Sequence, residues 1–171
     1  MFASATTFRG LRLAAALALT LAAAACAATP PGADGALAGG PGAPGSATPG
    51  SAQDFTVNVG DRVFFETDQS TLTTTAQATL DLQAQWLARY PRYAILIEGH
   101  ADERGTREYN FALGARRAQA VRDYLAARGV DAGRIRTVSY GKERPVAACP
   151  DPSCQAQNRR AVTVLEGGAG V

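Results

Sequence analysis

Asp102 and Arg117 are the two charged residues whose types and positions suggest specific chemistry. Asp102 lies in a charged loop after a strand-like run that Gly99 ends, and Arg117 lies in the helical segment that follows. On a wheel of about 100° per residue, Arg117 falls within the apolar face, whereas Arg116 falls on the opposite face. A guanidinium group at a core-facing position costs several kcal/mol unless an anion receives it. We therefore expect Arg117 to have a carboxylate partner or an anionic ligand.

Asp102 and Arg117 are expected to face one site, because long helical side chains lean toward the helix N-terminus, where the loop lies. An anion and a cation at one site suit a small zwitterionic group that is bound and not converted. Asn110, Gly114 and Arg117 stack at i, i+4 and i+7, and glycine leaves room for close approach to the backbone. This predicts a shallow groove with Arg117 at its floor. Alternatively, Arg117 pairs with Asp102 or Glu98 and only locks the loop.

The segments that must position this site alternate between strand and helix patterns. Strands are predicted at 63–65, 93–98, 135–140 and 160–165, and helices at 73–90 and 106–128. The order β-α-β-α-β-β with short connections predicts an α/β fold, a two-layer sandwich with helices on a mixed sheet. The loop 99–105 then lies at the carboxyl end of a strand, where such folds favour ligands. The aromatic residues are expected in the core, namely Phe64, Phe65, Trp86 and Tyr90.

Residues 1–25 read as an export signal. Arg9 and Arg12 precede or enter a nearly uninterrupted apolar run that is too short to span a bilayer with margin and ends in small residues. Cys26 follows directly, and LAAAAC resembles a bacterial lipobox, with Ala23 where a large aliphatic residue is usual. Cys26 is therefore expected to carry lipid.

Residues 26–53 are predicted to form a disordered tether, because their Gly, Pro, Ala, Ser and Thr cannot bury enough apolar area to offset the entropy of ordering. One folded domain over 54–167 and a tail at 168–171 complete the expected organisation.

Composition and charge exclude several classes of function. Removing Arg9 and Arg12 from the 17 basic residues leaves 15, equal to the 15 acidic residues. With one lysine and no basic run, nucleic-acid binding is not expected. His100 is the single histidine and gives no closed ligand set, so neither a metal nor a cofactor is expected. Glu98 and Asp102 could serve as the carboxylate pair of a glycosidase, but nothing here shows an activated nucleophile, and no enzyme is predicted.

The three cysteines are an odd number for an exported chain. Lipid on Cys26 leaves Cys149 and Cys154, which flank four residues. A disulfide across so short a loop would stabilise the fold by about 2 kcal/mol. The alternative is two free thiols.

Five segments resemble the OmpA-like peptidoglycan-binding domain family. The resemblance extends over 61–165, and so long an ordered set is specific. It implies non-covalent peptidoglycan binding without catalysis, by an outer-membrane lipoprotein whose domain faces the periplasm. The matching segments are EGHADERGT (98–106), YN (109–110), RRA (116–118), VSYGKERP (138–145) and NRRAV (158–162).

The resemblance also assigns a ligand. In the family, the aspartate of this loop and the second arginine of RRA hold the diaminopimelate of the peptide stem, and the matching positions are Asp102 and Arg117. Diaminopimelate ends in an ammonium beside a carboxylate, which suits an acceptor anion and a bidentate donor. Thr67 stands where some family members have an aromatic residue. The remaining expected ligand positions are Phe65, Thr67, Asp68, Asn110 and Gly114.

The protein partners implied by the resemblance are TolB and TolA, in a system that links the outer membrane to the cell wall and supports envelope integrity and cell division. An alternative function is a scaffold that docks TolB and TolA, with wall binding secondary. The basic run 158–160 is either a patch for partners or a charge cluster that discourages strand-edge pairing.

Overall fold

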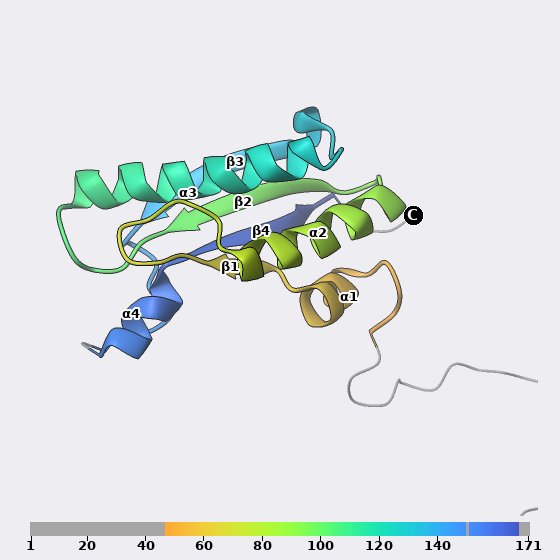
Figure 1. The fold of residues 1–171 in the computed structure, drawn as a ribbon. Coiled ribbons are helices and arrows are strands. Elements are labelled where there is room, and N and C mark those ends of the chain that lie inside the picture. The colour runs from red at the N-terminus through yellow and green to blue at the C-terminus, as the bar shows by residue number, and fades with distance from the viewer. Residues whose placement is uncertain (1–46, 150, 168–171) are drawn as a thin grey trace, which may run out of the picture. The chain divides into compact units, whose positions relative to one another are not determined.

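A computed structural model describes residues 47–149 and 151–167. Two helices, α2 and α3, pack on one face of a four-stranded sheet with the order β1-β4-β2-β3 (Figure 1). β2 and β3 are parallel, and β4 runs antiparallel to both β1 and β2, so the predicted mixed sheet and two-layer architecture are confirmed. The strands are β1 (Arg62–Phe64), β2 (Ala94–His100), β3 (Ile135–Gly141) and β4 (Arg160–Glu166).

Both predicted long helices form, within about one residue of the expected ends. α2 (Thr74–Arg89) begins after Thr73, whose side chain caps the first turn, and ends before Pro91. α3 (Arg107–Ala127) begins after Thr106, whose hydroxyl accepts a hydrogen bond from a backbone N–H of the first turn. These caps satisfy N–H groups that have no partner within the helix, and so fix where each helix starts.

Three short helical segments were not predicted. α1 (Ala52–Asp54) continues into the π-helical turn η1 (Phe55–Val59), η2 (Ala132–Arg134) is a 3₁₀ turn, and α4 (Pro152–Asn158) precedes β4. α4 changes the order to β-α-β-α-β-α-β. Each is too short to display the apolar period from which a helix is recognised in a sequence.

Packing begins within the range expected for the tether. The Gly50 carbonyl accepts hydrogen bonds from Tyr93 Oη and Arg92 Nη2, both at 2.8 Å, and Trp86 Nε1 donates to Asp54 at 2.8 Å. The predicted signal peptide, Cys26 and the tail 168–171 lie outside the described residues. The described part contains no helix of sufficient length and apolar character to cross a membrane.

The core lies between the helices and the sheet, and it includes Phe65 and Trp86 as expected. Phe64 is 48% exposed, so its predicted place in the core is wrong. In β1, Val63 points toward the core, and its neighbour Phe64 therefore points to the opposite face of the sheet.

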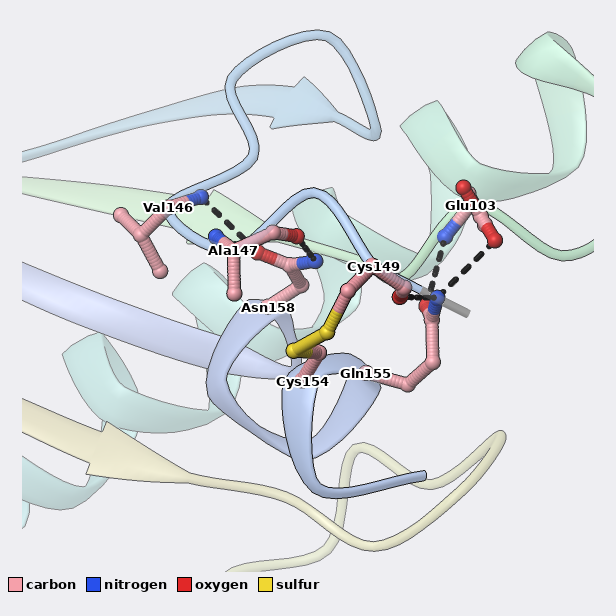
Figure 2. Close-up of a disulfide and its surroundings, with 7 residues drawn as sticks. All are labelled: Glu103, Val146, Ala147, Cys149, Cys154, Gln155 and Asn158. Atoms are coloured by element: carbon pink, nitrogen blue, oxygen red, sulfur yellow. Dashed lines mark hydrogen bonds between the residues drawn. A yellow bond between two sulfur atoms is a disulfide. The ribbon is translucent and has the colours of Figure 1, made fainter. Parts of the chain in front are cut away.

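The predicted disulfide between Cys149 and Cys154 is confirmed (Figure 2). It joins the segment after β3 to the first turn of α4, with 5.9 Å between the two Cα atoms. The end of α4 is tied to the same segment by Asn158, which accepts from Val146 N and donates to the Ala147 carbonyl.

Gly114 brings α3 against the sheet. A Cβ atom at this position would lie 2.4 Å from Ser139 Oγ and 2.8 Å from the Gly99 carbonyl oxygen. The predicted opening for a ligand at Gly114 is therefore filled by β2 and β3. Glycine is needed here because the helix and the strand approach more closely than any side chain permits.

Gly114→Ala is expected to destabilise the protein by up to about 2 kcal/mol, because overpacking at the strand, which costs about 1 to 3 kcal/mol, outweighs the gain of about 1 kcal/mol in helix propensity. Urea unfolding would measure the change. The control Ala115→Gly, at the exposed neighbour, should cost about 1 kcal/mol through propensity alone. A stabilised Gly114→Ala variant would contradict the packing role.

Candidate functional site

A cavity of about 320 Å³ brings most of the predicted site residues together. It is built by the loop after β1, the loop after β2 and the first two turns of α3, which adjoin because β1 and β2 both flank β4. Its lining consists of Thr67, Asp68, Asp102, Arg104, Gly105, Tyr109, Asn110 and Leu113. Thr67, Asp68, Asp102 and Asn110 thus share one site, as predicted.

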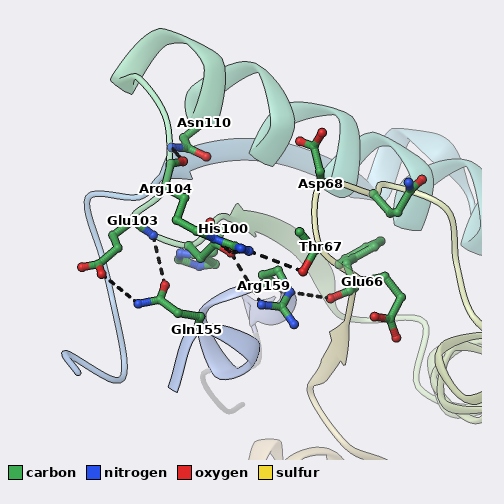
Figure 3. A network of polar contacts seen from close by, with 12 residues as sticks. Glu66, Thr67, Asp68, His100, Glu103, Arg104, Asn110, Gln155 and Arg159 are labelled. Carbon is green, nitrogen blue, oxygen red and sulfur yellow. Dashed lines mark hydrogen bonds and ion pairs between the residues drawn. The ribbon is translucent and has the colours of Figure 1, made fainter. Parts of the chain in front are cut away.

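Asp102 is the buried anion of this cavity, with 7% of its surface exposed. Its carboxylate accepts two hydrogen bonds from Arg104, at 2.5 Å from Nη2 and 3.2 Å from Nε. Arg159 Nη1 lies 3.5 Å from the same oxygen. Figure 3 shows Arg104 and Arg159 at this site. Burial alone would raise the pKa of Asp102, but the hydrogen bonds and charge of Arg104, helped by the charge of Arg159, bring the net pKa below the ordinary value. Asp102 is therefore ionised at neutral pH.

Arg117 lies beneath the cavity and is fully buried, with 0% of its surface exposed. Its guanidinium donates to three backbone carbonyls, those of Gln69 at 2.8 Å, His100 at 2.7 Å and Glu66 at 3.2 Å. The guanidinium carbon also stands 5.1 Å from the centre of the Phe65 ring. Burial lowers the pKa of Arg117 to about 10, which leaves it charged at neutral pH.

These contacts correct the alternative prediction that Arg117 pairs with a carboxylate, because within the described residues it forms no ion pair with Asp102 or Glu98. Arg117 lies below the residues that line the cavity, and its contact with a ligand stays a prediction. It does lock the loops, but through carbonyl oxygens in place of a carboxylate. Phe65 is likewise a buried packing partner of Arg117 and does not line the cavity.

Asp68 adds a second carboxylate on the opposite wall. Its backbone has φ 59°, a left-handed conformation that a non-glycine residue seldom adopts, and its carboxylate accepts a hydrogen bond from the Tyr109 hydroxyl. Arg104 reaches from the loop after β2 to Thr67 Oγ1 at 3.4 Å. Asn110 Nδ2 donates to the Arg104 carbonyl at 2.7 Å, which ties that loop to α3.

Arg159 and Arg160 have roles that differ from both predictions made for the basic run. Arg159 is largely buried and donates to the Phe65 carbonyl at 3.1 Å, while its own carbonyl accepts from Phe65 N at 2.9 Å. Arg160 is buried and donates to the Arg144 carbonyl. They form neither an exposed patch nor an edge cluster, because β4 lies inside the sheet.

His100 is buried beside the site, and neither ring nitrogen has a hydrogen-bond partner among the residues that the structure describes. Its Nε2 lies 3.6 Å from Glu98 Oε2. Burial, together with the charges of Arg160 and Arg144, lowers the pKa of His100 to about 4. Over 47–149 and 151–167, no three potential ligand residues are grouped in a way that would hold a metal ion.

His100 should make stability depend on pH. The pKa of His100 has the ordinary value of 6.5 in the unfolded chain and is about 4 in the folded protein. Between these two pH values the unfolded chain therefore binds more protons than the folded protein. Stability from this residue is fully present above about pH 6.5 and is lost as the pH falls toward 4, by about 2 to 3 kcal/mol. Urea unfolding at pH 7.5 and 4.5 measures this loss. It should be much smaller in His100→Gln, and an equal loss in both proteins would exclude His100 as its source.

A larger cavity, of about 610 Å³, lies on the other side of the first turns of α3. It contains none of the predicted ligand residues and no buried carboxylate. We therefore assign the ligand site by its chemistry to the smaller cavity. The larger one is lined by Arg107, Glu108, Phe111, Ser139, Tyr140, Gly141, Lys142 and Glu143.

Residues 64–159 match the family model described as the OmpA family. The chain belongs to the OmpA family. Among its OmpA-family relatives, the peptidoglycan-associated lipoprotein of Rhizobium meliloti is 68% identical over 155 residues, which are 91% of this chain and 87% of the relative. That of Brucella melitensis is 69% identical over 123 residues, or 72% of this chain and 73% of the relative. The resemblance seen in the sequence is thus confirmed.

Solved structures of two other proteins share this fold. The crystal structure of the peptidoglycan-associated lipoprotein from Burkholderia pseudomallei has 46% sequence identity and a TM-score of 0.60, and it covers 62% of this chain and 90% of that chain. The C-terminal domain of Helicobacter pylori MotB has 22% identity and a TM-score of 0.60, over 64% of this chain and 86% of that chain. The second likeness establishes the fold alone.

Proposed function

We propose that the chain binds peptidoglycan non-covalently through the 320 Å³ cavity and recognises the diaminopimelate of the peptide stem. The observation that carries the proposal is the convergence on one small cavity of Asp102 and Arg104, from the loop after β2, with Asp68, from the loop after β1. The volume of this cavity fits the end of one amino-acid side chain of the peptide stem better than it fits a sugar chain. The names of the relatives, peptidoglycan-associated lipoproteins, support the same ligand.

The ammonium group of the ligand is expected at Asp102. In the structure, Arg104 forms an ion pair with that carboxylate, and the Arg104 side chain is more than half exposed. An ammonium group that displaces Arg104 leaves its guanidinium free to receive the neighbouring carboxylate of diaminopimelate, in the bidentate way that arginine favours. Arg117 contributes its charge from below and holds both loops in place. Thr67, Asp68 and Asn110 complete the walls, whereas Phe65 and Gly114 support the site from the core.

Sedimentation with purified sacculi tests this proposal. The full chain should pellet with diaminopimelate-containing sacculi, and free meso-diaminopimelate should release it. Cadaverine is the matched competitor, because it carries the same two terminal ammonium groups on a chain of the same length without the adjacent carboxylates. Release by both compounds alike, or a chain that stays in the supernatant, would contradict recognition of the zwitterionic end.

In the cell, we propose a lipid anchor on Cys26 in the outer membrane, a tether that follows it and ends before Gly50, where packing begins, and a domain that faces the periplasm. The relatives are lipoproteins by name, which supports the anchor. Metabolic labelling with palmitate should mark the chain, and Cys26→Ser should abolish the label. Such an anchor would let the domain hold the outer membrane to the wall as part of the Tol-Pal system, which supports envelope integrity and cell division.

A second candidate function is docking of TolB and TolA, with wall binding secondary. The larger cavity and Phe111 beside it, 57% exposed, favour a further contact surface. This function would be favoured if Asp102→Asn captured TolB as efficiently as the unmodified chain does and also restored envelope integrity in the cell.

A further inference from the structure

Gln155 connects the disulfide-closed segment to the loop that carries Asp102 (Figure 2). Its side-chain carbonyl accepts a hydrogen bond from Glu103 N at 3.4 Å. Its amide group donates to Glu103 Oε1 at 2.9 Å and to the Cys149 carbonyl at 3.1 Å. With only 6% of Gln155 exposed, water cannot readily replace these bonds. Gln155 therefore holds both the backbone and the side chain of the residue that follows Asp102.

The disulfide fixes the backbone from which Gln155 extends. Cys154 immediately precedes Gln155, and its partner Cys149 supplies the carbonyl that Gln155 also binds. α4 has only seven residues, and Asp151 makes no side-chain capping bond at its start. A helix this short has little stability of its own in water. Its first turn therefore depends on the disulfide, while Asn158 holds its last turn.

Asn110 holds the Arg104 carbonyl of this loop from a buried position, but two other supports, those from Lys142 and Arg104, are more exposed. Lys142 Nζ donates to the carbonyls of Glu103 at 3.2 Å and Gly105 at 2.7 Å, in contacts that are open to solvent. Arg104 binds Asp102 itself, and under the proposed function it must leave that carboxylate when the ligand arrives. Gln155 makes no contact with the ligand cavity, so its bonds persist in both states.

We propose that Gln155 is a positioning residue for ligand binding, through which the Cys149–Cys154 disulfide acts on Asp102. This inference rests on the proposed function of the cavity. A dithiol such as dithiothreitol reduces the disulfide by two electrons to two thiols and is itself oxidised to a cyclic disulfide. The first turn of α4 then loses its cross-link, Glu103 loses its fixed partner, and the loop holds Asp102 less closely in its binding position.

The test compares sacculus binding by the oxidised and reduced full chain with that of Gln155→Ala. Reduction should weaken binding by the unmodified chain about 3- to 10-fold, the equivalent of one hydrogen-bonded link. Oxidised Gln155→Ala should bind as weakly as the reduced unmodified chain, and reduction should weaken it no further. Gln157→Ala, at an exposed position of the same helix, should behave like the unmodified chain.

Hydrogen exchange at the Glu103 amide gives a readout that does not need the ligand. Exchange should become faster on reduction and in Gln155→Ala, but not in Gln157→Ala. Gln155→Glu keeps the size of the side chain but places two carboxylates together, so it should also weaken binding. Adding Glu103→Gln restores an amide-to-carboxylate bond between the two residues, although the Cys149 carbonyl stays without its donor. The double variant should therefore recover part of the binding, which a general loss of stability would not allow.

Three outcomes would overturn the inference while leaving the proposed function intact. They are unchanged binding when the unmodified chain is reduced, a loss of binding on reduction of Gln155→Ala as large as that of the unmodified chain, and no recovery of binding in the double variant Gln155→Glu, Glu103→Gln. Failure of the oxidised unmodified chain to bind sacculi would instead refute the proposed function. Exchange at the Glu103 amide would then still decide whether the disulfide acts on this loop.

Discussion

Arg117→Ala should destabilise the folded protein by about 4 kcal/mol or more, the largest effect expected of any single substitution discussed. The variant leaves the carbonyls of Glu66, Gln69 and His100 without their donor in a buried place, and it opens a void beside the Phe65 ring. Hydrogen bonds to a charged donor are each worth about 1.5 to 3 kcal/mol, although their losses do not simply add. Sacculus binding should disappear with the fold.

Urea unfolding followed by circular dichroism measures this loss, with two comparison variants. Arg116→Ala, at the exposed neighbouring position, should stay within about 0.5 kcal/mol of the unmodified protein. Arg117→Lys keeps a charge but lacks the planar fork that reaches three separate carbonyls, so its stability should be intermediate. If Arg117→Ala retained full stability and lost only binding, Arg117 would serve the ligand directly, as its place on the helical wheel first suggested.

Arg117 also shows how much of the site could be predicted from the sequence. Its place within an apolar stripe predicted that it would be buried and would need acceptors. The acceptors proved to be backbone carbonyls, which every residue possesses, so no residue type in the loop 66–69 could have identified them. A buried arginine therefore indicates that some structure is being held together, but not which groups it holds.

The fold was predictable wherever an apolar period extended over several turns or a whole strand. α2, α3 and three of the four strands met that condition, and the sheet followed from their order and short connections. α4 did not, because its seven residues owe their conformation to the Cys149–Cys154 disulfide and to Asn158. The role of Gly114 was also missed, because a glycine that makes room for a ligand and a glycine that makes room for a strand look the same in the sequence.

Asp102 requires a different experiment, because its carboxylate is expected to contact the ligand. Asp102→Asn keeps the shape of the side chain and an oxygen for Arg104, but it removes the charge that an ammonium group needs. Binding to sacculi should fall by about 30-fold to several thousand-fold, which is the equivalent of the 2 to 5 kcal/mol lost when one partner of a buried charge pair is removed. The fold should lose much less, since Arg104 is largely exposed and Arg159 retains its bond to the Phe65 carbonyl.

The pH dependence of binding separates Asp102 from its surroundings. The pKa of Asp102 lies below the ordinary value, so its carboxylate stays ionised well below neutral pH. The part of the folding stability that depends on this charge is lost only as the pH falls through that lowered pKa. Binding by the unmodified chain should therefore be level between about pH 8 and pH 6.5, above the range in which His100 affects the fold, and Asp102→Asn should be equally weak throughout. Asp123→Asn, on the exposed side of α3, is the matched control and should bind normally. Full binding by Asp102→Asn, with the fold intact, would place the ammonium group elsewhere, and Asp68 would be the next carboxylate to replace.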